Sequence, residues 1–297
     1  GGTAAQALRE TVELAKTCDR LGYHRYWLAE HHNIINFAGS APEILIGKVA
    51  GETTRIRVGA GGIMLPHYSP LKVAECFKML ETLYPGRIDL GLGRAPGTDP
   101  RTSAALQPGP KAYPVEVFPQ QIELLQRFLA DDFPEGHPYH GIHAMPLGPV
   151  QPALWMLGSS IQGALYAAEF GLPYCHAHFI TPEESERSVA IYRQHFKPSL
   201  QLAAPYAALG CSVLAADTPE QAAHLAKSRN LWLTRLLMGN RGSFLPPDAV
   251  DAHPFTQAER ELYQSVGARS LTGAGPECKD KLTALGARHG VDEFILL

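Results

Sequence analysis

A regular alternation of strand-like and helix-like segments constrains the fold of this chain more than any other feature. Seven short apolar segments, rich in β-branched and aromatic residues, are separated by stretches with the three-to-four spacing of amphipathic helices. The seven segments are 23–30, 55–65, 87–94, 153–160, 172–179, 206–216 and 291–297. Because strands that alternate with helices run parallel, the sequence predicts an α/β fold.

The strand number and the length of 297 residues favour a (β/α)₈ barrel over an open sheet. No G-x-G-x-x-G pattern follows the first strand, which weakens the dinucleotide-binding alternative. We expect one barrel domain over 1–297, with irregular insertion segments at about 95–151 and 240–270. The pattern begins with a helix and ends with a strand. The first barrel strand is therefore expected to precede the sequence, and a last helix to follow it.

Composition argues against several classes of protein. The 26 basic residues nearly balance the 29 acidic residues without a long basic run, so nucleic acid is not an expected partner. No apolar run approaches the roughly eighteen residues of a membrane span, and the N-terminus does not resemble a signal peptide. The 5 cysteines are scattered without C-x-x-C spacing, which predicts a cytoplasmic protein without a zinc–cysteine site.

Reactive side chains follow several predicted strands, where barrel enzymes place their catalytic groups. Glu30, His31 and His32 end the first strand, and His176 and His178 end a later one. The H-x-H spacing suits a metal, but no matching carboxylate cluster accompanies it, so no metal is predicted. Two interpretations of His31 and His32 stay open: proton transfer near neutral pH, or a hydrogen-bonded polar patch at the rim.

Two segments are candidates for binding an anion. Gly158, Ser159 and Ser160 precede a helix, whose first N–H groups attract phosphate, and Arg94 follows another strand. An ordinary serine N-cap would explain the same pattern. The segment 271–277 is the second candidate, with a glycine turn before a proline-initiated helix as its alternative.

Glycines at 59, 61 and 62 interrupt a predicted strand. Glycine weakens a strand interior unless the backbone needs it. Either a distorted backbone or a flat ring system pressed against the strand would account for these residues.

Four segments together resemble the flavin-dependent luciferase-like monooxygenases. They are LGYHRYWLAEHHN, IRVGAGGIMLPHYSPLKVAE, LYPGRIDLGLGRAPGTD and LGSS followed by AAEFGLP. The similarity runs through most of the chain in order and weakens across 100–150 and 240–270. It implies a barrel that binds reduced FMN, or F420 in some branches, with a lid at 240–270. The implied enzyme is an FMN-dependent monooxygenase that uses O₂ to oxidise a small organic substrate such as an aldehyde.

The resemblance also implies site residues. His31 corresponds to the histidine that assists proton transfer at the flavin, and His32, its neighbour, is the second predicted catalytic residue. Gly61–Gly62 corresponds to a non-prolyl cis peptide behind the flavin ring, and Arg94, Ser159 and Ser160 match residues that hold the phosphate. The predicted cofactor-binding residues are Glu30, Gly61, Gly62, Arg94, Gly158, Ser159 and Ser160.

The chain departs from luciferase at two positions: Gly93 replaces a reactive cysteine, and Ser159 replaces a glutamate of the phosphate loop. Light emission is therefore not predicted. An F420-dependent dehydrogenase or reductase and a non-catalytic flavin-binding protein remain as alternatives. The expected partners are a flavin reductase and a second copy of the chain. Small residues in 41–51 could pack against that copy or within the chain.

Overall fold

The computed structural model describes residues 2–95, 97–107, 115–240 and 242–297. Contacts divide the chain into two compact units. The first unit comprises Gly1–Leu157, Phe170–Leu172 and Ser199–Ala203, and the second comprises Gly158–Glu169, Pro173–Pro198 and Ala204–Leu297. The single domain expected over 1–297 stays a prediction, and each unit is described by itself.

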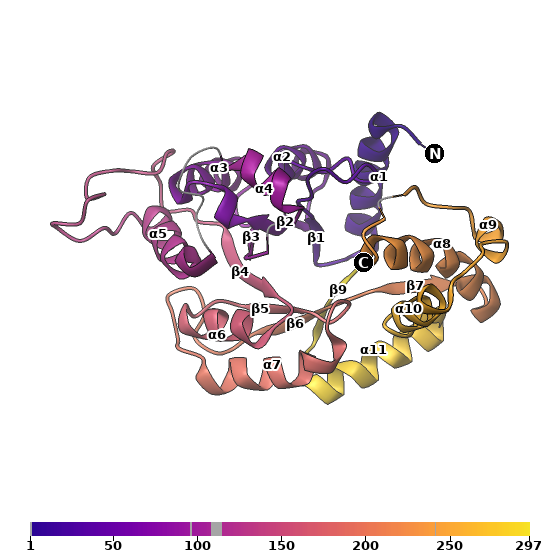
Figure 1. Cartoon of the computed structure of the whole chain (residues 1–297). Helices are drawn as coiled ribbons and strands as arrows, with labels where there is room; N and C mark the ends of the chain where they lie inside the picture. The colour runs from indigo at the N-terminus through magenta and orange to yellow at the C-terminus, as the bar shows by residue number, and fades with distance from the viewer. Residues whose placement is uncertain (1, 96, 108–114, 241) are drawn as a thin grey trace. The chain divides into compact units, whose positions relative to one another are not determined.

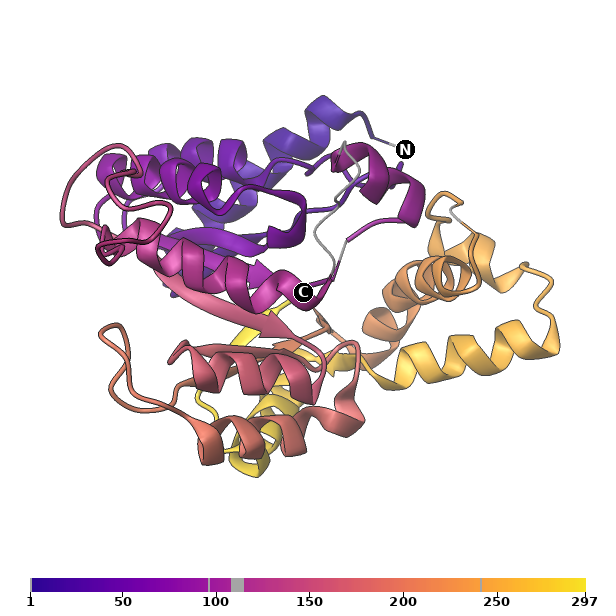
Figure 2. The same cartoon turned by 60° about the vertical axis from the view of Figure 1, so that its left-hand side comes forward.

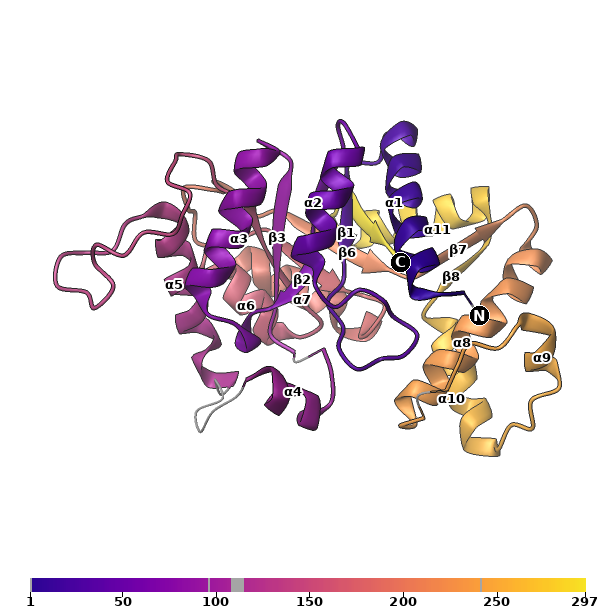
Figure 3. The same ribbon diagram turned by 90° about the horizontal axis from the view of Figure 1, so that it is seen from above.

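The first unit is built on parallel strands that pair in sequence order. The strands are β1 (Arg25–Leu28), β2 (Arg57–Met64), β3 (Ile88–Gly93) and β4 (Ala153–Gly158). The helical segments are α1 (Ala4–Leu21), α2 (Pro42–Glu52), η1 (Leu65–His67), α3 (Pro70–Leu83), α4 (Pro100–Leu106), η2 (Val115–Val117) and α5 (Phe118–Ala130). Figure 1 shows α1, α2 and α3 along one side of the strands, and Figure 3 shows them side by side from above.

The second unit contains two groups of parallel strands. β5 (Tyr174–Ala177), β6 (Ala207–Cys211) and β9 (Glu293–Leu296) form one group, and β7 (Val213–Ala216) pairs with β8 (Leu271–Ala274) in the other. The helices are α6 (Ile161–Glu169), α7 (Pro182–His195), α8 (Pro219–Leu237), α9 (Pro247–Asp251), α10 (Gln257–Ala268) and α11 (Gly275–His289). Figure 2 shows α6 and α7 packed side by side.

All seven predicted strand segments contain a strand, so the predicted α/β class with parallel pairing is confirmed. The segment 206–216 differs, because it holds two strands in two sheets. The change occurs at Ser212, whose carbonyl accepts a hydrogen bond from the backbone N–H of Leu271 in β8. Of the predicted insertion segments, 95–151 contains α4 and α5, and 240–270 contains α9 and α10. Residues 96, 108–114 and 241 of these segments lie outside the described residues.

The two faces of the first sheet differ in chemistry. Val58, Ala60, Leu90 and Leu92 are fully buried, as the core face of a sheet requires. The other face carries the charged residues Arg57 and Asp89, and Asp89 is also fully buried. This buried ionic cluster, formed by Arg25, Trp27, Arg57, Asp89 and Trp155, was not predicted from the sequence.

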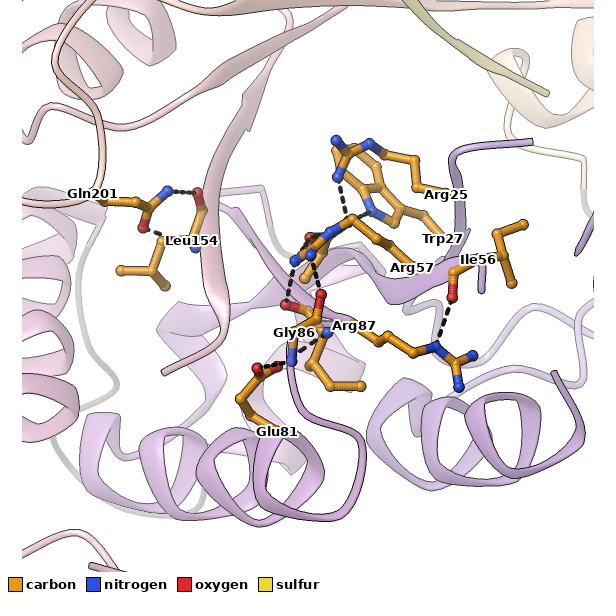
Figure 4. Close-up of polar contacts among 11 residues, drawn as sticks. Arg25, Trp27, Ile56, Arg57, Glu81, Gly86, Arg87, Leu154 and Gln201 are labelled. Carbon is orange, nitrogen blue, oxygen red and sulfur yellow. Dashed lines mark hydrogen bonds and ion pairs between the residues drawn. The ribbon is translucent and has the colours of Figure 1, made fainter. Parts of the chain in front are cut away.

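Asp89 is the centre of the cluster. Its Oδ2 accepts hydrogen bonds from Arg25 (2.5 Å) and from Trp27 Nε1 (2.9 Å), and its Oδ1 accepts one from Arg57 Nε (2.8 Å). Figure 4 shows the side chains of Arg25, Trp27 and Arg57 converging from neighbouring strands. The Arg25 guanidinium also lies 4.6 Å from the centroid of the Trp155 ring. Every oxygen of the buried carboxylate is therefore paired with a donor.

The glycines of β2 are explained by close approach within the protein. A Cβ at Gly59 would lie 2.5 Å from the Asp89 Cβ, and one at Gly62 would lie 2.6 Å from the Gly91 carbonyl oxygen. The Gly61–Gly62 peptide bond is cis, which confirms that expectation. The register of β2 on β3 shifts between Ala60 and Ile63. Of the two explanations open from the sequence, a distorted and crowded backbone accounts for these glycines without a ligand.

Candidate active site

Glu30 lies in the loop that follows β1, and its carboxylate connects three segments. The residue is fully buried. Its Oε2 accepts a hydrogen bond from the backbone N–H of Met64 (2.9 Å), and its Oε1 accepts one from the Tyr68 hydroxyl (2.6 Å). His32 Nε2 lies 2.7 Å from the same Oε1. The loop after β1 is thereby fixed to the end of β2 and to the segment after η1.

His31 occupies a different environment from His32. Its backbone N–H donates to the Gly39 carbonyl (3.2 Å), and its ring lies 5.1 Å from the Phe37 ring, centroid to centroid. Burial lowers the pKa of His31, opposed by a hydrogen bond to the Gly97 backbone and by the nearby charge of Glu30. The net direction is downward from 6.5, so the His31 imidazole is neutral at pH 7 and has a lone pair available.

His67 and Tyr68 complete the polar side chains at this edge of the first unit. The His67 ring lies 6.3 Å from the His32 ring, centroid to centroid, and its Nδ1 lies 3.4 Å from Gln107 Nε2. Burial and the hydrogen bond to Glu30 raise the pKa of Tyr68, so its hydroxyl keeps the proton. Both residues follow the predicted strand segment 55–65, and neither was predicted to be a site residue. The sequence signal that could have identified them is their position directly after a predicted strand.

Arg94 directly follows β3 and is half-buried. Within the described part of the chain, its guanidinium makes no hydrogen bond and no ion pair. A permanently charged group in that position fits an anionic ligand, since arginine presents several donors in a planar fork. Gly61 and Gly62 lie in the adjacent strand β2, at its cis peptide bond and at the shift in its register on β3.

In the second unit, Gly158, Ser159 and Ser160 precede α6 as expected. The Ser160 carbonyl accepts hydrogen bonds from the N–H groups of Gly163 (3.1 Å) and Ala164 (3.4 Å). Thr181 Oγ1 donates to the Ser159 carbonyl (2.5 Å). The hydroxyls of Ser159 and Ser160 make no hydrogen bond to any described residue. Side-chain capping is thus not the role of these serines, and their hydroxyls stay available to a ligand.

The second anion candidate, 271–277, is occupied by the protein's own carboxylate. Its first four residues form β8, and Glu277 Oε2 accepts a hydrogen bond from the Ala274 N–H (3.2 Å). A bound anion would be repelled by this carboxylate. Of the alternative, a glycine turn before a proline-initiated helix, the helix is confirmed, since Pro276 lies in the first turn of α11. Strand β8 replaces the predicted turn.

His176 and His178 have separate hydrogen-bond partners. His176 Nδ1 lies 2.9 Å from the Tyr174 hydroxyl, and His178 Nδ1 lies 2.9 Å from Ser185 Oγ. Burial, with His289 nearby, lowers the pKa of His178 to about 4. Among the residues the structure describes, no group of three His, Cys, Asp or Glu side chains could hold a metal ion.

None of the described helices combines the length and apolar character needed to cross a membrane.

Comparison with known proteins gives consistent matches along the whole chain. The family model described as luciferase-like monooxygenase matches residues 1–293. The N-acetyl-S-alkylcysteine monooxygenase of Bacillus subtilis (strain 168) is 37% identical over 300 residues, covering 100% of this chain and 88% of that protein.

Two solved structures are similar in fold. The crystal structure of apo-MsnO8 matches with a TM-score of 0.89 at 37% identity, covering 100% of this chain and 87% of that one. The oxygenating constituent of 3,6-diketocamphane monooxygenase from Pseudomonas putida, in complex with FMN, matches with a TM-score of 0.69 at 19% identity, covering 100% and 87%. At that lower identity the likeness shows the fold alone. The predicted class of (β/α)₈ barrel is confirmed.

Proposed function

The chain belongs to the luciferase-like monooxygenase family, and we propose that it uses reduced FMN and O₂ to oxidise a small organic substrate. The observation that carries the proposal is the pair of histidines after β1. His31 is neutral and half-buried, while His32 is bound to a buried carboxylate. An oxygenase needs proton transfer and oriented reactants at a partly desolvated site, and His31 can provide the first and His32 the second.

The residues present fit FMN as the cofactor. When bound, reduced FMN supplies the electrons that activate O₂. We propose that Arg94 of the first unit holds its phosphate, because the guanidinium makes no bond to a described residue. In the second unit, the hydroxyls of Ser159 and Ser160 and the backbone at Gly158 are proposed as phosphate-binding groups. Gly61 and Gly62 are proposed to line the ring, and FMN in the structure of a related fold supports the choice of cofactor.

We propose catalytic roles for both histidines. His31, neutral near pH 7, would accept a proton at the reacting centre through its ring lone pair. His32 would present a hydrogen-bonding nitrogen to the bound reactants. An aldehyde is one proposed substrate class, and a thioether is a second, because a relative at 37% identity is named for an S-alkylcysteine substrate.

Two partners are proposed. A flavin reductase would supply the reduced FMN. A second copy of the chain would cover α2 and α3, where Ile44, Met79 and Leu83 are 71%, 57% and 63% exposed. Two of the small residues of α2 pack within the chain: Ala50 is buried, and a Cβ at Gly47 would lie 3.4 Å from Leu80 of α3.

The proposed function is tested by labelling with ¹⁸O₂. Under anaerobic conditions, the protein is mixed with reduced FMN and with either an aldehyde or a thioether. ¹⁸O₂ is then admitted. We expect product that carries one labelled oxygen atom, formed in proportion to the O₂ consumed. Hydrogen peroxide without labelled product would contradict an oxygenase acting on these substrates. Substrate-dependent reduction of oxidised F420, or oxidation of reduced F420, without oxygen would favour the F420-dependent dehydrogenase or reductase alternative. FMN binding without product would favour a flavin-binding protein.

The proposed phosphate contact makes a separate prediction. Arg94→Ala should weaken FMN binding about 10- to 100-fold, because a hydrogen bond to a charged group contributes roughly 1.5–3 kcal/mol. Riboflavin has the same ring and no phosphate, so its affinity should not change. Arg101→Ala, at an exposed position of α4, is the matched control. Equal losses for FMN and riboflavin, measured by fluorescence quenching, would show that Arg94 does not contact the phosphate.

A further inference from the structure

The environment of Glu30 determines which of its neighbours donate hydrogen bonds. The Met64 backbone N–H can only donate, and it donates to Oε2. The Tyr68 hydroxyl keeps its proton and donates to Oε1 at 2.6 Å. A carboxylate accepts hydrogen bonds and donates none. His32 Nε2, 2.7 Å from Oε1, must therefore carry a hydrogen atom.

The other ring nitrogen of His32 has no such constraint from the protein. In the described part of the chain, Nδ1 of His32 makes no hydrogen bond. The side chain keeps 12% of its surface exposed, while that of Glu30 has none. In the neutral ring, with the hydrogen on Nε2, Nδ1 has a lone pair and accepts hydrogen bonds.

We infer that Glu30 is a positioning residue for His32, which it holds in the Nε2–H tautomer so that Nδ1 accepts a hydrogen bond from an O–H or N–H group of the bound reactants. This inference rests on the proposed function. The two histidines then have different roles: His31 exchanges a proton, and His32 orients a donor group. Glu30 then acts on the cofactor site through His32, since both of its carboxylate oxygens accept hydrogen bonds from protein donors.

The substitution Glu30→Gln should reverse the tautomer. The Met64 N–H requires an oxygen at the Oε2 position, so the amide nitrogen must take the Oε1 position. The NH₂ group then donates to Nε2 of His32, and the ring hydrogen moves to Nδ1. Tyr68→Phe is the matched control, because it removes a donor from the same Oε1 and leaves Glu30 facing His32. The tautomer should not change in this control.

The tautomer is read by ¹⁵N NMR of histidine-labelled protein, without cofactor. In the unsubstituted protein, His32 should show a protonated Nε2 and an unprotonated Nδ1. In Glu30→Gln the two signals should exchange roles. A protonated Nδ1 in the unsubstituted protein would overturn the inference even if the variant does not fold. An unchanged tautomer in folded Glu30→Gln would overturn it as well.

A double-mutant cycle separates positioning from a general structural effect. Glu30→Gln should lower the oxygenation rate about 10²-fold, the loss that a reactant misplaced by about 1 Å can cause. In a His32→Ala background the same substitution should have little further effect, because Glu30 acts through His32. An equal loss in both backgrounds would overturn the inference. If the unsubstituted protein oxygenates nothing, the proposed function fails, and the NMR result still decides the role of Glu30.

Discussion

Asp89→Ala should lower the free energy of unfolding by about 3–5 kcal/mol, the usual cost of removing one partner from a buried ion pair. Asp89 is fully buried and accepts hydrogen bonds from Arg25, Trp27 and Arg57. Its loss leaves the Arg25 side chain, only 8% exposed, without its carboxylate partner. Urea unfolding followed by circular dichroism and by tryptophan fluorescence would measure the effect, because two tryptophans lie in the cluster.

An exposed ion pair of the same unit provides the control. Glu123 and Arg127 on α5 pair at 3.1 Å, with side chains 56% and 32% exposed. Glu123→Ala should cost about 0.5 kcal/mol or less, as i, i+4 pairs on helices do. Asp89→Asn should give an intermediate loss, because the amide keeps one acceptor oxygen. A loss below about 1 kcal/mol for Asp89→Ala would mean that the arginines find water or other partners, and that the cluster does not stabilise the sheet.

The contacts of this ionic cluster could not be predicted from the sequence. Strands and helices were predicted because their apolar spacing is local, and the strand-end rule then located Glu30, His31, His32 and Arg94. Asp89 is 64 residues from Arg25 and 32 residues from Arg57, and only the pairing of three strands brings them together. The same reason explains segment 206–216, in which the exchange of pairing partner at Ser212 depends on distant strands.

The location of the candidate site was predicted from the sequence, but its contacts were not. The histidines follow a strand, so their location could be read from the sequence, but the bond between Glu30 and Tyr68 joins two loops. For the glycines of β2, the sequence left open both a distorted backbone and a bound ring system, because it does not show which residues of β3 lie beside them. Local sequence patterns therefore predicted the candidate residues, and non-local contacts determine which groups each residue touches.

His31→Ala should lower the rate of substrate oxygenation about 10²- to 10⁴-fold, the range that general acid–base catalysis usually contributes. His143→Ala is the matched control, since His143 is an exposed histidine of the first unit that pairs with Asp131. Its substitution should leave the rate unchanged. An equal rate for His31→Ala and the unsubstituted protein would remove His31 from the mechanism.

The pH dependence of the same reaction tests the protonation state of His31. Burial lowers the pKa of His31 below 6.5, against the opposing effects of the Gly97 backbone and Glu30, while the positive charge of a protonated His32 would lower it further. Protonation removes the lone pair, so oxygenation by the unsubstituted protein should be constant at neutral pH and fall as the pH drops through this pKa. The falling limb should be absent in His31→Ala, whose residual rate does not depend on that imidazole. A limb that persists there would assign the titration to another group, and a rate that rises at low pH would mean that His31 acts in its protonated form.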